Sequence, residues 1–198
     1  MLGPVPMKLV LASQSPRRRE LLRTAGLTFT VRICAVNEIR GPGEDPETYA
    51  RRLARDKAEA AWLAGPQSPD EVVLGADTIV VLGGMVLEKP DGAEGARWML
   101  QQLSGHEHRV ITGVCLKCAR GAKVASESTL VKFAVLSADE IAEYVASGEP
   151  MDKAGAYAIQ GLASKFVERI EGCFFNVVGL PVALVYRMLK DLEGTTIA

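Results

Sequence analysis

The sequence predicts an α/β fold built on a mixed, twisted β-sheet with flanking helices, and three observations lead to this class. Strand-like and helix-like hydrophobic patterns alternate along all 198 residues, as they do in α/β proteins. Gly83-Gly84 separates two apolar runs and indicates a tight hairpin. The strands also outnumber those of a plain strand–helix–strand repeat, so the sheet must include antiparallel pairs. A chain of this length can bury one substantial core and can divide it into two lobes.

The expected elements begin with a strand at 9–12. The helix that follows has Ser15 as its N-cap, Pro16 at its first helical position and Gly26 as its C-terminal cap. Asp45 is the expected N-cap of the second helix. The remaining expectations are strands at 72–82, 85–87, 109–118, 129–136, 166–170 and 174–178, a polar connection at 119–128, and helices at 45–63, 93–103, 137–146 and 181–189.

The charge balance excludes several classes of function. The 23 basic and 24 acidic residues give a net charge of −1. A general nucleic-acid or membrane-surface binder needs an excess of basic residues, so no nucleic-acid or membrane partner is expected. No apolar run in the sequence reaches the length of a membrane-spanning helix.

The N-terminal residues 1–7 are Pro-rich and lack the apolar core of a signal peptide, which predicts a cytoplasmic protein. We expect residues 1–7 to form a flexible extension and residues 8–198 to form a single domain. Met1 and Met7 are both candidate start sites.

The four cysteines do not form a zinc site or a redox motif. Cys115 and Cys118 make a CxxC pair, but no second pair completes a zinc knuckle. The pair lies in a predicted strand, away from any helix N-terminus that would activate a thiol. We therefore expect inert, reduced thiols. His106 and His108 could share one face of a strand, but the sequence shows no partner ligand for them.

The segment from Ser13 to Glu20 puts positive charge at the wrong end of a helix. Arg17 and Arg18 fall in the first turn, beside unpaired N–H groups and the positive end of the helix dipole. They destabilise the helix unless an anion lies among them. Together with the hydroxyls of Ser13 and Ser15, these groups form an anion site, and we expect phosphate there. The alternative is that the arginines are solvated or pair with distant acids.

Two further charged side chains lie in apolar surroundings. Lys57 interrupts the apolar face of the helix at 45–63, so it either extends to solvent or needs a buried anion such as phosphate. Asp77 interrupts the apolar strand at 72–82. Turn N–H groups could hold its carboxylate, but a catalytic or metal-binding role is favoured. Gly75-Ala76 beside it are expected to leave room for a ligand.

Lys89 follows Glu88 where the second hairpin strand ends. A surface ion pair between the two is one interpretation, and contact of Lys89 with a phosphate is the other. The two common phosphate-binding patterns, GxxxxGK[ST] and GxGxxG between a strand and a helix, are absent from the sequence. Any nucleotide chemistry would therefore use a different arrangement.

Several short blocks, taken in order, form a specific set that covers almost the whole chain after Met7. The blocks are Ser13-x-Ser15-Pro16-Arg17-Arg18-x-Glu20-Leu21-Leu22, Ala54-Arg55-x-Lys57-Ala58, Gly75-Ala76-Asp77-Thr78, Glu88-Lys89-Pro90, 103–105 with 112–114, 149–157, Ile159-Gln160-Gly161 and 176–181. In this order they resemble the Maf-like nucleotide pyrophosphatases.

This resemblance implies an ITPase/Maf-like fold with two lobes around a nucleotide cleft. It implies hydrolysis of nucleoside triphosphates between the α- and β-phosphates, with a divalent cation, Mg²⁺ or Mn²⁺. Asp77 would be the catalytic base and, with Glu38, a metal ligand. The resemblance also implies a homodimer. The phosphate contacts that it implies are Ser13, Arg17, Arg18, Lys57 and Lys89.

Three positions resemble one branch of the family. Arg17, Thr78 and Gln160 match the branch that acts on dTTP and UTP, whereas the 7-methyl-GTP branch typically has an aromatic residue, Gln and Glu there. The resemblance therefore implies dTTP, UTP and modified pyrimidine nucleotides as substrates. Two alternatives stay open. One is a pyrophosphatase for 7-methyl-GTP or non-canonical purine nucleotides, and the other is a nucleotide-binding regulator of septum formation.

Overall fold

The computed structural model describes residues 7–194, with side chains as far as residue 192. Most of the expected N-terminal extension therefore lies outside the described residues, as does the candidate start at Met1. Met7 is described, and its side chain packs against a buried apolar cluster.

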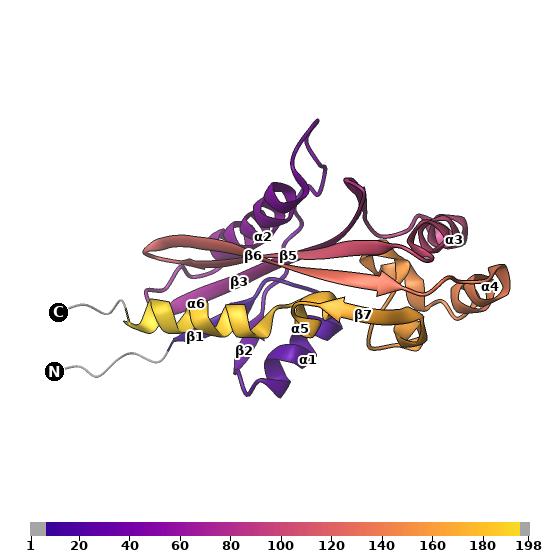
Figure 1. Cartoon of the computed structure of the whole chain (residues 1–198). Helices are drawn as coiled ribbons and strands as arrows, with labels where there is room; N and C mark the ends of the chain where they lie inside the picture. The colour runs from indigo at the N-terminus through magenta and orange to yellow at the C-terminus, as the bar shows by residue number, and fades with distance from the viewer. Residues whose placement is uncertain (1–6, 195–198) are drawn as a thin grey trace. The chain divides into compact units, whose positions relative to one another are not determined.

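Within the described residues, seven strands form one mixed sheet in the order β2-β1-β3-β5-β6-β7, and β4 pairs with β3 (Figure 1). The β1–β2 and β1–β3 pairs are parallel, whereas the β3–β4 and β6–β7 pairs are antiparallel. The predicted fold class is confirmed. The strands are β1 (Lys8–Leu11), β2 (Phe29–Val31), β3 (Glu71–Leu82), β4 (Met85–Leu87), β5 (Glu107–Cys118), β6 (Gly121–Phe133) and β7 (Val167–Glu171).

The helices begin where the capping residues predict. Ser15 and Asp45 each accept an N–H of the helix that follows, and Ser137 and Glu140 form a capping box. The helices are α1 (Pro16–Thr24), α2 (Pro46–Leu63), α3 (Gly92–Leu103), α4 (Ala138–Ala146), α5 (Phe174–Val178) and α6 (Val182–Gly194), with 3₁₀ turns η1 (Glu149–Asp152), η2 (Ala154–Ala156) and η3 (Leu162–Phe166).

Two expectations about secondary structure are wrong. Residues 174–178 form the short helix α5 in place of a strand, because a brief apolar run does not distinguish a buried strand from a buried helical turn. The supposed connection at 119–128 belongs mostly to β6, which begins at Gly121. Its polar residues occupy a strand whose side chains are largely exposed or half-buried, so low hydrophobicity hid the strand.

Tertiary contacts divide the chain into two compact units. The first unit is Met1–Asp77, Thr112–Glu127 and Gly179–Ala198, and the second is Thr78–Ile111 and Ser128–Val178. The boundary falls inside β3, so Asp77 is the last residue of the first unit in that strand. The expectation of a single domain over 8–198 stays a prediction.

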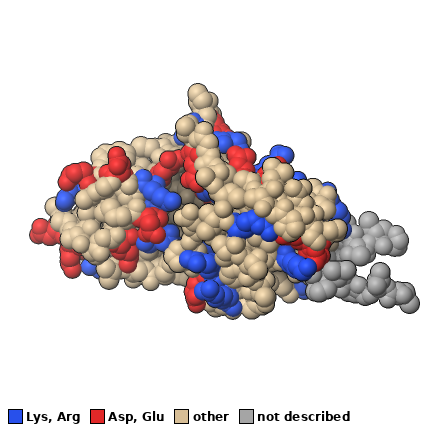
Figure 2. All heavy atoms as spheres, turned by 180° about the vertical axis from the view of Figure 1, so that it is seen from behind, with Lys and Arg blue, Asp and Glu red and all other residues tan. Residues whose placement is uncertain are grey.

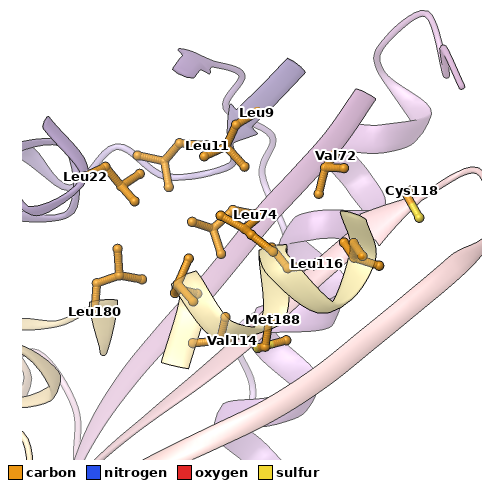
Figure 3. Packing of buried hydrophobic residues seen from close by; sticks show 14 residues of the cluster. Leu9, Leu11, Leu22, Val72, Leu74, Val114, Leu116, Cys118, Leu180 and Met188 are labelled. Carbon is orange, nitrogen blue, oxygen red and sulfur yellow. The ribbon is translucent and has the colours of Figure 1, made fainter. Parts of the chain in front are cut away.

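The first unit has an apolar layer on each face of its strands. Leu9 and Leu11 face α1 and α6, whereas Val10 faces α2, as the alternation of a strand requires. Helices cover both faces, with α2 on one and α6 on the other (Figure 1). Figure 3 shows the layer under α6, whose buried members are Leu9, Leu11, Leu22, Val72, Leu74, Ala76, Val114, Leu116, Cys118, Leu180, Val185, Met188, Leu189 and Leu192.

Two glycines bring α2 against the sheet. A Cβ on Gly75 of β3 would collide with the carbonyl oxygen of Ala54, and one on Gly113 of β5 would collide with that of Ala50. The backbone of α2 therefore rests directly on the backbone of two strands. The expectation that Gly75 leaves room for a ligand is wrong, because the helix fills that space.

The second unit packs aromatic rings beside its strands. The rings of His108, Phe133 and Tyr157 meet edge to face, with centroids 4.8–5.4 Å apart. Tyr144 of α4 makes a similar contact with Phe166, at 5.4 Å. The helices α3 and α4 pack against each other and against η1.

The surface mixes charges of both signs. On the face in Figure 2, lysines and arginines are interspersed with acidic residues, in keeping with the net charge of −1. No helix in the described part of the chain is long and apolar enough to cross a membrane.

Candidate active site

The loop after β1 builds the N-terminus of α1. The Ser15 hydroxyl accepts the N–H of Arg18 at 3.4 Å, and the Ser13 hydroxyl accepts the N–H of Ser15 at 3.2 Å. Since β1 is parallel to β3 and pairs Leu11 with Leu74, these residues lie at the carboxyl end of β1. Ligands of open α/β sheets bind at this edge.

Two hydrogen bonds hold the Arg18 side chain, one to this loop and one to Gly179. Its Nε donates to the Gly179 carbonyl at 2.8 Å, and its Nη1 donates to the Ser13 hydroxyl at 3.2 Å. Burial lowers the pKa of the Arg18 guanidinium, and the negative charge of Asp77 opposes this change. Arg17 lies in the same helical turn and is half-buried. The cationic helix N-terminus is thus confirmed, and an anion bound to it stays a prediction.

Lys57 and Asp77, the two misplaced charges of the sequence, form a pair. Lys57 Nζ lies 2.6 Å from Asp77 Oδ1, and the two side chains are only 15% and 11% exposed. The ammonium also contacts Glu38 Oε1 at 2.8 Å. Carboxylates therefore supply the buried anion that the position of Lys57 requires, where we expected phosphate or an extension to solvent.

Asp77 combines burial with a charged partner. It lies three residues beyond the point where β1 ends opposite Leu74, in the part of β3 that extends past its neighbour. Burial raises the pKa of Asp77 above its ordinary value of 3.8, while the positive charges of Lys57 and Arg18 hold it down. A carboxylate with a raised pKa that is still held in its ionised form is suited to accept a proton near neutral pH.

Glu38 reaches this pair from the loop between β2 and α2. Its side chain is 49% exposed, and its backbone is also held. The Tyr49 hydroxyl donates to the Glu38 carbonyl at 2.5 Å. Tyr49 is buried on α2, about two turns before Lys57. The same helix therefore holds both the lysine and the loop that brings Glu38 to it.

An ion pair closes this loop onto α2. Arg52 Nε and Nη2 contact the two oxygens of Glu44 at 2.7 and 2.8 Å, and Nη2 also donates to the Ile39 carbonyl at 3.0 Å. The hydrogen bond from Arg52, with help from the Gly41 N–H, lowers the pKa of Glu44 to about 2. Sequence analysis missed this pair. Arg52 lies on the polar face of a helix and Glu44 in a loop, so no periodic spacing links them.

Each unit contains some of the residues that the sequence predicted as site residues. Thr78 follows Asp77 on β3 and is half-buried, Lys89 is exposed after β4, and Gln160 is exposed in a turn before η3. Lys89 forms no ion pair with any residue that the structure describes, which disfavours its pairing with Glu88. The first unit contains Ser13, Arg17, Arg18, Glu38, Lys57 and Asp77, and the second contains Thr78, Lys89 and Gln160.

The carboxylates suit a cation that also binds substrate. Among the described residues, no group of three or more His, Cys, Asp and Glu could hold a metal ion. Asp77 and Glu38, however, already face one cation, the Lys57 ammonium. Mg²⁺ usually takes one or two carboxylates and completes its octahedron with water and substrate phosphates. This donor set fits such an ion.

The chain matches a known family along almost its whole length. The model of the family described as Maf-like protein matches residues 8–192. The chain belongs to the Maf family. The resemblance seen in the ordered sequence blocks is therefore confirmed.

Curated relatives within the Maf family carry an activity in their names. A protein of Koribacter versatilis named dTTP/UTP pyrophosphatase is 55% identical over 185 residues, covering 93% of this chain and 94% of the relative. A protein of Anaeromyxobacter dehalogenans with the same name is 52% identical over 187 residues, covering 92% and 93%. The match thus extends over nearly the full length of both relatives.

A solved structure shares the fold of this Maf chain. The Ham1 protein of Staphylococcus aureus superposes with a TM-score of 0.53 at 14% identity, covering 93% of this chain and 98% of the other. At that identity the likeness concerns the fold alone.

The cysteines of this Maf chain do not form disulfides. All four thiols are free, and Cys115 and Cys118 are buried in β5. Burial raises the pKa of the Cys115 thiol to about 12, so the thiolate that reacts or binds metal is disfavoured. The expectation of inert thiols agrees with this environment.

Proposed function

We propose that this protein hydrolyses dTTP and UTP, and modified pyrimidine nucleotides, to the monophosphate and pyrophosphate. The observation that supports this most is the buried Asp77 carboxylate, held 2.6 Å from the Lys57 ammonium beside a cationic helix N-terminus. The relatives named dTTP/UTP pyrophosphatase support the choice of substrate.

In the proposed reaction a water attacks the α-phosphorus. The new bond joins the water oxygen to phosphorus, the bond to the bridging oxygen breaks, and pyrophosphate leaves. Asp77 takes the proton of the attacking water. Burial raises its pKa, which makes it a stronger base than an ordinary aspartate, while the positive charges of Lys57 and Arg18 favour its ionised form.

Positive groups offset the charge of the triphosphate. Arg17, Arg18, the Ser13 hydroxyl and the N–H groups of the α1 N-terminus would contact phosphate oxygens from the first unit. Lys57 would exchange part of its contact with carboxylates for a phosphate. Lys89, exposed in the second unit, would contribute a further cation.

Asp77 and Glu38 would together hold a divalent cation, Mg²⁺ or Mn²⁺. When bound, this ion would neutralise charge on the phosphates and polarise the reacting phosphoryl group. The remaining part of the proposal assigns base selection to Arg17, Thr78 and Gln160. It also includes a homodimer in the cytoplasm, which sedimentation of the purified protein and fractionation of cells would test.

Release of pyrophosphate across a panel of nucleotides tests the proposal. The purified protein would receive dTTP, UTP, dGTP, ITP and 7-methyl-GTP, each with Mg²⁺, with Mn²⁺ or with EDTA. We expect turnover of dTTP and UTP that requires the metal and exceeds that of the purine nucleotides.

Other results would redirect the assignment in specific ways. Preference for 7-methyl-GTP or ITP would keep the reaction and overturn the role of Arg17, Thr78 and Gln160. Binding of nucleotides without turnover of any of them would favour a regulator. Full turnover in EDTA would remove the metal from the proposal.

A further inference from the structure

We infer that the side chains of Tyr144 and Glu149 form a positioning pair that fixes the turn containing Gln160 and thereby sets the preference for pyrimidine bases. This inference rests on the proposed function, because it assumes that Gln160 contacts the base. Tyr144, Glu149 and residues 158–162 all belong to the second unit.

Gln160 occupies the third position of a tight turn. The Gly161 N–H donates to the Ala158 carbonyl at 3.0 Å, which closes the four-residue turn. Ile159 at the second position is buried and Gln160 at the third is exposed. The carboxamide of Gln160 makes no hydrogen bond with any residue in the described part of the chain. The backbone is thus anchored beneath a side chain that is available to a ligand.

The Tyr144–Glu149 pair holds this turn from both ends. The Tyr144 hydroxyl accepts the N–H of Ala158, the first residue of the turn, at 3.2 Å. Glu149 Oε2 accepts the N–H of Leu162, the residue that follows the turn, at 3.1 Å. The hydroxyl also donates to Glu149 Oε1 at 2.8 Å, which links the two anchors. Each end of the turn is therefore tied to one connected pair of side chains.

The turn is shaped to receive the carboxylate. A Cβ on Gly161 would collide with the Glu149 carboxylate, so a side chain at this position would push the two apart. Glycine lets the backbone beside Gln160 lie directly against Glu149. This close approach accompanies the hydrogen bond from the Leu162 N–H to the same carboxylate.

The pair is itself held rigidly. Tyr144 is 2% exposed and packs edge to face on Phe166. The Glu149 backbone is held at its N–H by the Ser147 hydroxyl, 3.2 Å away, and at its carbonyl by Lys153 Nζ, 2.8 Å away. Burial and the hydrogen bond to Glu149 raise the pKa of Tyr144, so its proton stays in place to bridge the pair. Rigid support of this kind fixes where a recognition group lies.

The chemistry of Gln160 suits a pyrimidine base. Thymine and uracil present an N–H donor between two carbonyl acceptors, and a carboxamide can pair with one donor and one acceptor of that edge. Guanine also has a donor beside an acceptor, so this double contact favours the smaller pyrimidine ring only if the carboxamide is fixed in position and direction. Tyr144 and Glu149, which lie away from the base contact, would supply this constraint through the backbone.

Two conservative variants test the pair. Tyr144→Phe removes the hydroxyl and keeps the ring, while Glu149→Gln replaces one acceptor oxygen with a donor group. Tyr157→Phe is the matched control, since it removes another buried hydroxyl of the second unit. This hydroxyl lies 2.9 Å from His108 Nε2 and forms no hydrogen bond with the turn in the described part of the chain. The readouts are kcat/KM for dTTP and for dGTP, and amide hydrogen exchange at Leu162.

We expect the ratio of kcat/KM for dTTP to that for dGTP to fall about tenfold in Tyr144→Phe and in Glu149→Gln, with faster exchange at Leu162. Tyr157→Phe should retain the wild-type ratio. Equal losses for both nucleotides, or an unchanged ratio, would overturn the inference while leaving the proposed function intact. The wild-type protein is measured first. If it fails to hydrolyse dTTP and UTP, the proposed function fails, and this inference fails with it.

Discussion

The two units hold their candidate functional residues by different means. In the first unit, charge holds the Asp77 side chain itself, through Lys57 Nζ at 2.6 Å. In the second unit, hydrogen bonds to the backbone hold the turn around Gln160, and its side chain is left exposed. A charged contact both positions a group and changes its pKa, which a base requires. A backbone anchor positions without changing the chemistry of the side chain, which is sufficient for recognition.

The largest effect is expected for the substitution that removes the charge of Asp77 in the first unit. Asp77→Asn keeps the shape of the side chain but cannot accept a proton, so turnover of dTTP should fall about a thousandfold. Nucleotide binding, followed by calorimetry, should persist. Asp70→Asn is the control, because Asp70 is an acid of the same unit that pairs with Lys8 at 2.8 Å. Wild-type turnover in Asp77→Asn would show that another group is the base.

Replacement of Lys57 separates positioning from the change in pKa. Lys57 lowers the pKa of Asp77, so Lys57→Met should raise that pKa and move the acid limb of the pH profile of kcat/KM to higher pH. Activity at the optimum should also fall, by about a hundredfold.

Lys117→Met is the matched control for this substitution. Lys117 is a half-buried lysine of the first unit, 3.9 Å from Glu59. It should leave the acid limb where it is. If the acid limb of the pH profile does not move in Lys57→Met, the limb reports the titration of a group other than Asp77.

The two units should also lose stability in different ranges of acid pH. Burial lowers the pKa of His108 in the second unit from 6.5 to about 4. The neutral ring stabilises the fold above pH 6.5, and this contribution, about 3 kcal/mol, is lost as the pH falls from 6.5 towards 4. The pKa of Glu44 in the first unit is lowered from 4.5 to about 2, so its contribution is lost only between those values. Arg52 is 36% exposed, which limits this contribution to less than about 1 kcal/mol.

The tryptophans allow this difference to be measured. Trp62 belongs to α2 in the first unit and Trp98 to α3 in the second. Urea unfolding of two variants is followed by tryptophan fluorescence at pH 7, 5.5 and 4. In Trp98→Phe the remaining Trp62 reports the first unit, and in Trp62→Phe the remaining Trp98 reports the second. His108→Gln should abolish the loss between pH 6.5 and 4 in the second unit, and Glu44→Gln should leave it unchanged. If His108→Gln loses the same stability between pH 6.5 and 4, His108 is not the source of that loss.

The smallest effect is expected for the cysteines. Cys115→Ala and Cys118→Ser should each change kcat/KM by less than about twofold, because both residues lie in the apolar core of the first unit. Since burial raises the pKa of Cys115 to about 12, this thiol should resist alkylation by iodoacetamide at pH 8. Mass spectrometry of native and unfolded protein checks this. A large loss of turnover would place a thiol in the mechanism.

Individual site residues were easier to predict from the sequence than the residues that they contact. Lys57 and Asp77 were each recognisable because a charge interrupted an apolar pattern. Their contact with each other was not predictable, since it depends on how closely α2 lies on β3. The helix caps at Ser15 and Asp45 were predictable because they are local interactions.

Features that depend on distant contacts escaped prediction. Nothing in the spacing links Glu44 to Arg52, or Tyr144 to the turn at 158–161. The helix α5 was mistaken for a strand because residues 174–178 are too few for a helical period to appear. The conformation of such a segment is decided by its neighbours.

The contact of α2 with Gly75 and Gly113 has an evolutionary consequence. Because backbone meets backbone there, no side chain can be trimmed or repacked to compensate for a change at either glycine. Any replacement displaces the helix, and Lys57 moves with it. Natural variation at these two positions should therefore be restricted as severely as at the lysine itself, although neither glycine would ever meet a nucleotide. Selection for the reaction would therefore also restrict Gly75 and Gly113, which take no direct part in it.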